Sequence, residues 1–196
     1  MPVGPAVALF LLLAAVDHLL VAAPGVWPWY RDNLRRGINR ARWWEYSVSA
    51  SVMVVLIAQI TGVSDAGALV AVFGANAAMI FFGLVMELVN RPGRAVTWTP
   101  FLLGCVVGAV PWLIIAYQFA GAVDRAPAGE GPPAFVYGIV VSLFVLFNSF
   151  AVNMALQYKR VGPWRTYLFG ESAYLVLSLT AKTALAWQVF ANTLVG

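Results

Sequence analysis

The chain has 196 residues, of which 62% are hydrophobic and only 10% are charged, and its mean hydropathy is +0.82. Because a soluble domain carries about 25% charged residues, this composition excludes a soluble globular protein. The formal net charge is +4, but the basic residues do not gather into a patch with interleaved polar contacts. This argues against a nucleic-acid-binding protein.

Long apolar segments follow one another along the whole chain, and each approaches or exceeds the roughly 20 residues that a helix needs to cross a bilayer. They are continuous and too long for the strands of a membrane β-barrel, and the loops between them contain proline and glycine. The sequence therefore predicts an all-α membrane protein, a single transmembrane helical bundle domain over residues 1–196. The six predicted spans are Ala6–Ala23, Trp43–Thr61, Ala66–Val89, Pro100–Ala120, Ala134–Tyr158 and Tyr167–Asn192.

The basic residues between the spans predict the orientation. Ten of the twelve lie in the first, third and fifth loops, whereas the second and fourth loops together carry only Arg125. The positive-inside rule then places the first, third and fifth loops in the cytoplasm of a multi-pass plasma-membrane protein, with the C-terminus extracellular. The uncharged N-terminus would also lie outside, without the basic stretch of a secretory signal. We expect a further helix upstream in the natural protein; unaided translocation of the short tail is the alternative.

Asp17 and His18 lie in the first span, and adjacent helical residues point apart. His18 is either a proton acceptor near a functional group or a core histidine with its hydrogen bonds satisfied. Asp17 is expected to face a polar interior or the cytoplasmic boundary. One histidine and one cysteine, Cys105, offer neither a metal-ligand set nor an internal disulfide.

Glu45 lies near the cytoplasmic end of the second span. It would reach the middle of the membrane more easily if its helix began earlier, near Arg35 or Arg36. Glu45 is either a counter-charge for a buried cation or an interfacial glutamate paired with Arg42, one turn away.

Lys182 lies about midway along the last span, in the segment SLTAKTALAW (residues 178–187). A charge at that depth costs a few kcal/mol or more, so the side chain must be neutral, paired or chemically modified. A buried neutral amine is nucleophilic, which suits a Schiff base with an aldehyde. The alternative is a structural ion pair inside the bundle, for which Glu45 is the natural partner.

Other polar and aromatic residues within the spans allow two interpretations. The polar ones either form ordinary interhelical hydrogen bonds or line a site, and Ser178 lies one turn before Lys182. The aromatic ones either pack ordinarily or enclose a ligand. The polar and aromatic residues with these two interpretations are Ser49, Asn76, Asn148, Ser149, Ser178, Trp112, Phe147, Phe150 and Trp187.

The remaining acids in and near the spans are predicted to lie at helix ends. Asp65 is predicted to cap the third span, Glu171 to lie near the start of the last, and Glu87 near a helix end.

Five segments closely resemble the heliorhodopsins: RWWEYSVSAS (42–51), FGAN (73–76), FVYG (135–138), FNSF (147–150) and LSLTAK (177–182). The resemblance runs along essentially the whole chain and keeps the order of the motifs. It implies a retinal protein of seven helices with a cytoplasmic N-terminus, of which this chain matches the second to the seventh. The resemblance implies two departures from the family: the first helix, which carries another histidine of the polar cavity, would not be part of this chain, and Asp17 would stand at a usually apolar position.

Carried over by position, the resemblance implies that Lys182 forms the Schiff base of retinal, all-trans in the dark, with Glu45 as its counterion. Ser49 and Ser178 would hydrogen-bond around it, and His18 would belong to a polar cavity nearby. The other residues that the resemblance places around retinal are Asn76, Tyr46, Met79, Phe147, Phe150 and Trp187.

A proton pump needs a proton donor as well as an acceptor. In the pumping microbial rhodopsins, the donor lies eleven residues after the acceptor, and here that residue is Leu56. Their second counterion position is Ser178 here. We therefore expect a light receptor with a slow photocycle and a sensory or regulatory output, rather than a pump or an enzyme. Its expected partners are retinal, the lipid bilayer, a second copy in a homodimer, and a signalling partner. The alternatives are an ion transporter that uses Lys182 and Glu45, or a structural membrane protein without a ligand.

Overall fold

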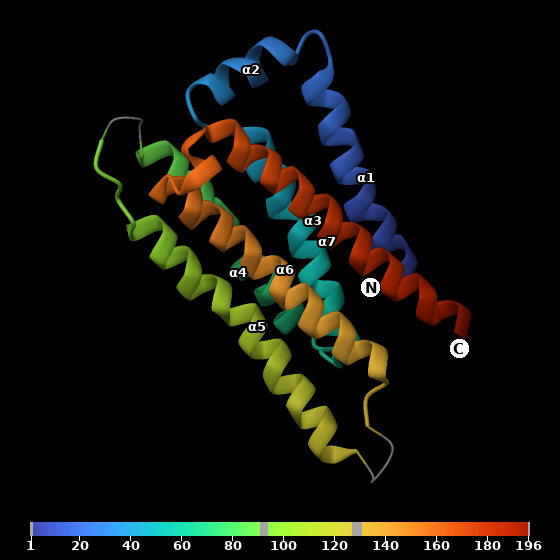
Figure 1. The fold of residues 1–196 in the computed structure, drawn as a ribbon. Coiled ribbons are helices and arrows are strands. Elements are labelled where there is room, and N and C mark those ends of the chain that lie inside the picture. The colour runs from blue at the N-terminus through green and yellow to red at the C-terminus, as the bar shows by residue number, and fades with distance from the viewer. Residues whose placement is uncertain (1, 91–93, 127–130, 196) are drawn as a thin grey trace. The chain divides into compact units, whose positions relative to one another are not determined.

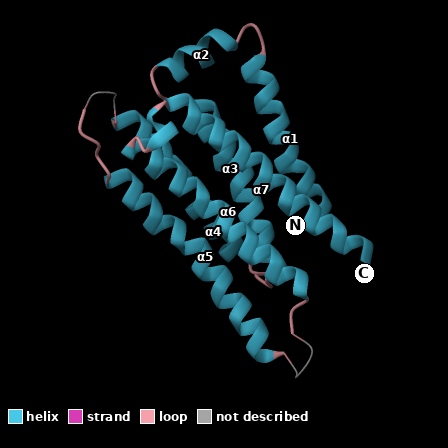
Figure 2. Cartoon of the chain, in the orientation of Figure 1, coloured by secondary structure: helices cyan, strands magenta, loops and turns pink. Residues whose placement is uncertain are grey.

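The computed structural model describes residues 2–90, 94–126 and 131–195, and side chains as far as residue 191. Over these residues the regular structure is helical throughout (Figures 1 and 2). The elements in chain order are α1 (Val3–Ala22), α2 (Trp27–Arg35), α3 (Arg40–Ile60), α4 (Ala66–Val89), α5 (Thr99–Arg125), α6 (Ala134–Lys159), the short 3₁₀ helix η1 (Gly162–Arg165) and α7 (Tyr167–Val195).

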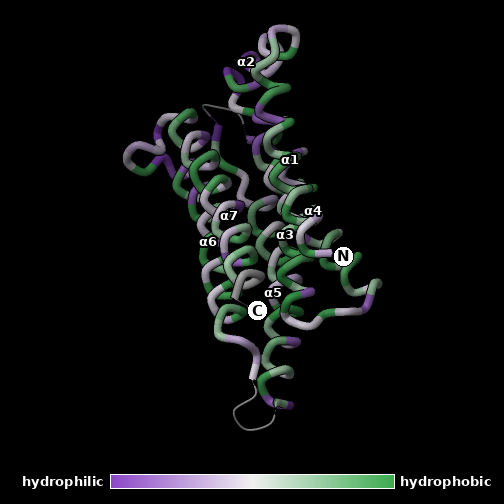
Figure 3. Tube along the Cα trace, turned by 90° about the vertical axis from the view of Figure 1, so that its right-hand side faces the viewer, coloured by the Kyte–Doolittle hydropathy of each residue, from purple (hydrophilic) through white to green (hydrophobic). Residues whose placement is uncertain are grey.

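Within the described part of the chain, six helices are long and apolar enough to cross a membrane: α1, α3, α4, α5, α6 and α7. Each contains most or all of one predicted span, so the prediction of an all-α membrane protein is confirmed. Figure 3 shows hydrophobic residues along these helices and hydrophilic residues towards their ends and on α2. These spans can be predicted from sequence because each apolar run is about as long as a helix that crosses the bilayer.

The first loop differs from the prediction because it contains α2. Pro28 stands in the first turn of this helix, where its missing N–H is tolerated, and Arg35 stands in the last. Gly37, with φ of 73°, separates α2 from α3. The possible earlier start of the Glu45 helix near Arg35 or Arg36 is therefore wrong, and α3 begins at Arg40. A nine-residue polar helix leaves no trace in a hydropathy window about twice its length.

Residues 1–118 form one compact unit, in which α3 packs against both α1 and α4. Asn39 caps α3 by accepting a 3.1 Å hydrogen bond from the backbone N–H of Arg42. Asp65 caps α4 by accepting one of 2.7 Å from Ala68, as the sequence predicts. These caps satisfy backbone donors that a helix start leaves open.

Residues 119–196 form the second unit, built around the pairing of α6 with α7. Asn153 Nδ2 donates to the carbonyl of Gly170 at 3.1 Å, while Trp164 Nε1 donates to Asn153 Oδ1 at 2.7 Å. Further along the pair, Gln188 Nε2 donates to Ser142 Oγ at 3.0 Å. The helix that carries Lys182 is thus tied to α6 by polar contacts on either side of the lysine.

Candidate functional site

Lys182 lies near the middle of α7, on its buried face. Its side chain is only 5% exposed, and Nζ donates a 2.9 Å hydrogen bond to Ser178 Oγ. Residues spaced by three or four positions, Tyr174, Ser178, Lys182 and Leu185, are all buried, which is the periodicity of one helical face. The predicted neighbourhood of Ser178 and Lys182 is therefore present in the second unit.

The predicted aromatic residues of this unit fall into two groups. Phe147 and Phe150 are half-buried on α6, and the ring of Phe150 lies 6.1 Å from that of Tyr174 on the buried face of α7. Trp187 is 63% exposed and packs edge-on against Phe190. Five residues beyond Lys182, it lies about 140° around the helix. The structure thus brings Phe150 towards the lysine-bearing face and does not bring Trp187 there.

Glu45 lies in the second turn of α3 in the first unit, where it is 9% exposed beside the equally buried Tyr46. One turn further on, Ser49 is fully buried, and its Oγ has no hydrogen-bond partner among the described residues. A buried hydroxyl without a partner raises the free energy of the folded state by about 1–3 kcal/mol. Such a group needs an explanation, and a ligand or an ordered water at Ser49 would supply it.

Asn76 and Met79 lie on α4 in the same unit. Asn76 is 2% exposed and donates from Nδ2 to Ser51 Oγ at 3.0 Å, which links α4 to α3. Met79 is half-buried, and its side chain occupies the space that a Cβ at Gly108 of α5 would need. Both residues therefore lie between helices of this unit, as residues that line an internal pocket would.

His18 lies on an exposed part of α1. Its Nδ1 is 2.7 Å from the carbonyl oxygen of Ala14. Because a carbonyl only accepts, this contact assigns the proton of the neutral ring to Nδ1 and leaves Nε2 as an acceptor. Asp17, the next residue back, is half-buried. The role of His18 in proton transfer stays a prediction.

Glu87, predicted only to lie near a helix end, is the centre of a buried polar cluster. Its Oε1 accepts from Arg42 Nη2 at 2.6 Å, and its Oε2 accepts from Trp43 Nε1 at 2.7 Å and from the backbone N–H of Asn39 at 2.8 Å. The side chains of Arg42 and Glu87 are 5% and 2% exposed. Arg42, the sequence-based candidate partner of Glu45, thus forms an ion pair with Glu87. The sequence signal that could have predicted this pair is an acid at the end of one apolar span, Glu87, and an arginine at the start of the preceding span, Arg42.

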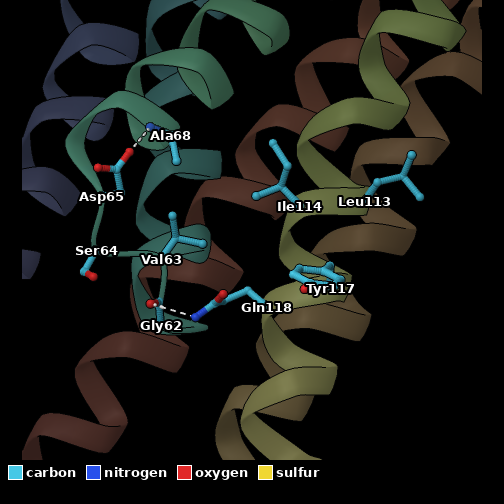
Figure 4. A pocket seen from close by; sticks show the side chains of 9 residues that line it. All are labelled: Gly62, Val63, Ser64, Asp65, Ala68, Leu113, Ile114, Tyr117 and Gln118. Carbon is cyan, nitrogen blue, oxygen red and sulfur yellow. Dashed lines mark hydrogen bonds between the residues drawn. The ribbon is translucent and has the colours of Figure 1, made fainter.

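An open pocket of about 430 Å³ lies at the turn between α3 and α4 in the first unit. Gln118 Nε2 of α5 donates a 3.1 Å hydrogen bond to the carbonyl of Gly62 there, and the backbone N–H of Ala68 donates to Asp65. Both hydrogen bonds are drawn as dashed lines in Figure 4. Gly62 follows Glu45 by 17 residues, which corresponds to about 25 Å along a helix. None of the predicted site residues lines this pocket, so it is separate from the candidate site.

Six membrane-length helices among the described residues, with an amine buried midway along the last, define a multi-pass helical membrane protein. The family model for heliorhodopsin matches residues 1–194, and the chain therefore belongs to the heliorhodopsin family. The resemblance read from the five motifs is confirmed, and the protein is a rhodopsin-type retinal protein. No match to the chain was found among curated proteins.

Proposed function

We propose that the protein binds retinal covalently through Lys182 and is a light receptor with a slow photocycle and a sensory or regulatory output. The observation that carries this proposal is the burial of Lys182, 5% exposed on the inner face of an apolar helix. A lysine at such a depth requires a functional or structural reason, and membership of a retinal-protein family supplies the functional one.

The residues present fit a bound retinal. Nζ of Lys182 has Ser178 Oγ at 2.9 Å to orient it, and an amine in an apolar surrounding suits reaction with an aldehyde. The unpartnered Oγ of Ser49 is a second group that a ligand or a water held with it would satisfy. When bound, retinal supplies the visible absorption and the light-driven change of shape.

The chain's own residues would supply the electrostatics. With a proton on the Lys182 nitrogen, Glu45 is proposed as the carboxylate that balances the positive charge, because a buried cation needs an opposite charge. Ser178 and Ser49 would hydrogen-bond near that nitrogen. Tyr46, Asn76, Met79, Phe147 and Phe150 are proposed to surround the polyene, and His18 to accept a proton in a cavity nearby. Trp187, which α7 turns away from the lysine-bearing face, is left out of this set.

The absence of a proton donor on α3 supports a receptor rather than a pump. Leu56, eleven residues after Glu45, is fully buried and cannot carry a proton. Light would therefore shift charge relative to Glu45 without an onward relay along this helix, and the bundle would relax into a second state. We further propose that the first, third and fifth loops face the cytoplasm, where a signalling partner would bind, and that the protein is a homodimer.

Visible spectroscopy of the full-length protein supplied with all-trans retinal tests this function. We expect a visible band in the wild type, none in Lys182→Ala, and none in the charge-retaining control Lys182→Arg. Glu45→Gln should shift the band to the red, because a weaker counter-charge favours the excited state. A wild type without a visible band would refute the proposal that the protein is a light receptor. Light-induced pH changes in cells would instead support transport.

A further inference from the structure

Glu87 is a buried charged residue to which the proposed function gives no role. It lies two residues before the end of α4 and is 3% exposed. Three donors converge on its two oxygens, from Arg42, Trp43 and the backbone of Asn39, at 2.6–2.8 Å. Such a set of donors suits an ionised carboxylate, which accepts at both oxygens.

Arg42 connects this cluster to the candidate site. On α3 it precedes Glu45 by three residues, and side chains with that spacing are neighbours on a helix, with Cβ atoms about 5–6 Å apart. Both side chains are buried, where charges are screened less than in water. The positive charge of Arg42 therefore acts on Glu45 unless a second carboxylate compensates it.

The cluster also fixes where the guanidinium lies. Cζ of Arg42 is 4.3 Å from the centroid of a Trp43 ring, a cation–π distance. The Trp43 ring in turn packs against Gly83 of α4, where a Cβ would overlap the ring. Arg42 is thus held towards α4 by Glu87 and by an indole that has room only because residue 83 is glycine.

We propose that Glu87 neutralises Arg42 and thereby keeps Glu45 as the effective negative charge for the Lys182 nitrogen, an inference that rests on the proposed function. Glu87 acts through Arg42, so it is a positioning residue. Its removal does more than loosen the bundle, since it leaves an uncompensated cation one helical turn from the counterion.

The spectral test compares Glu87→Gln with two matched variants. In Glu87→Gln, the unbalanced Arg42 offsets part of the Glu45 charge, so the visible band shifts to the red, by less than in Glu45→Gln. In Arg42→Gln/Glu87→Gln both charges are gone, and the band returns to the wild-type position. Trp43→Phe removes one donor to Glu87 without changing any charge, and its band stays in place.

A second readout uses the protein without retinal. Breaking a buried ion pair from one side is strongly destabilising, so the melting temperature of Glu87→Gln falls by on the order of 10 °C. The double variant recovers most of that loss, because it leaves no unpaired charge.

The outcomes separate this inference from the proposed function. If wild type forms pigment and Glu45→Gln shifts its band while Glu87→Gln does not, Glu87 is only structural and the inference is wrong. If Glu87→Gln does not fold, the position of the visible band of Arg42→Gln/Glu87→Gln tests the inference instead. A wild-type band position supports charge compensation, and a band as red as that of Glu45→Gln overturns it. If wild type forms no pigment, the proposed function itself fails, and this inference with it.

Discussion

Ser49 and Ser51 are two residues apart on α3, and both are fully buried. Ser51 Oγ accepts from Asn76 at 3.0 Å, whereas Ser49 Oγ has no partner among the described residues. A satisfied hydroxyl contributes to stability, but an unsatisfied one opposes folding. The same side chain therefore has opposite effects at these two positions, and the unsatisfied one is the serine that the family resemblance places near the chromophore.

These two serines give a matched pair of variants. Ser51→Ala should lower the free energy of unfolding of the retinal-free protein by about 1–3 kcal/mol, because it leaves Asn76 without its acceptor. Ser49→Ala should leave this free energy unchanged or raise it slightly. Titration with denaturing detergent in mixed micelles measures both. Equal losses in the two variants would show that Ser49 has a protein partner.

Lys182 and Ser178 allow a second test at single residues. Ser178→Ala removes the 2.9 Å bond from Nζ and should lower the free energy of unfolding by about 1 kcal/mol, the usual net contribution of one hydrogen bond. Thr180→Ala, on an exposed part of the same helix, is the control and should change it little. The same detergent titration applies, and an unaffected Ser178→Ala would mean that the bond contributes nothing to folding.

Glycines decide how closely the helices approach at the scale of whole elements. At Gly83 of α4 a Cβ would overlap the Trp43 ring of α3, and at Gly108 of α5 it would overlap Met79 of α4. Close approach through small residues is a general feature of helix packing in membranes. The α3–α4 contact that carries the Arg42–Glu87 pair therefore depends on one missing methyl group.

Two glycines of α4 provide the corresponding test. Gly83→Ala should destabilise the protein by about 1–3 kcal/mol, the usual cost of overpacking. Gly74→Ala, where a Cβ meets nothing within 4 Å, should be neutral or slightly stabilising, since alanine favours helix over glycine. Melting temperatures of the two variants make the comparison. A tolerated Gly83→Ala would show that the Trp43 ring can move aside.

At the scale of the whole molecule, charge rather than apolar character specifies orientation. The six apolar helices found in the described part of the chain can cross a membrane in either direction. The excess of arginine and lysine in alternate loops is what favours one of the two. α2 contributes to this bias, because Arg31 and Arg35 lie on it and Asp32 pairs with both, at 3.2 and 3.8 Å.

Labelling of introduced cysteines tests the orientation. In a Cys105→Ser background, Arg36→Cys and Val161→Cys should react with an impermeant thiol reagent only after cells are opened. Asp124→Cys should react in intact cells. All three positions are exposed, so reactivity reports the side of the membrane. The reverse pattern would contradict the proposed topology.

The candidate site could be predicted in part. Lys182 stands out in sequence because a lone charge inside an apolar run is costly, and Ser178 follows from helical spacing. Glu45 required the family resemblance, since by hydropathy it lies near a helix end. Trp187 had the right residue type, but α7 turns it away from the lysine-bearing face.

By itself, the sequence determined the spans, the membrane environment, the family and the buried amine, because each depends on composition or spacing along one segment. Only the tertiary structure decided which carboxylate neutralises Arg42 and which α3 serine finds a partner. Glu87 is forty-five residues from Arg42 along the chain, yet the two form a buried ion pair. Partners on different helices depend on how those helices are rotated and how closely they approach. That depends on packing around residues such as Gly83, which no local pattern specifies.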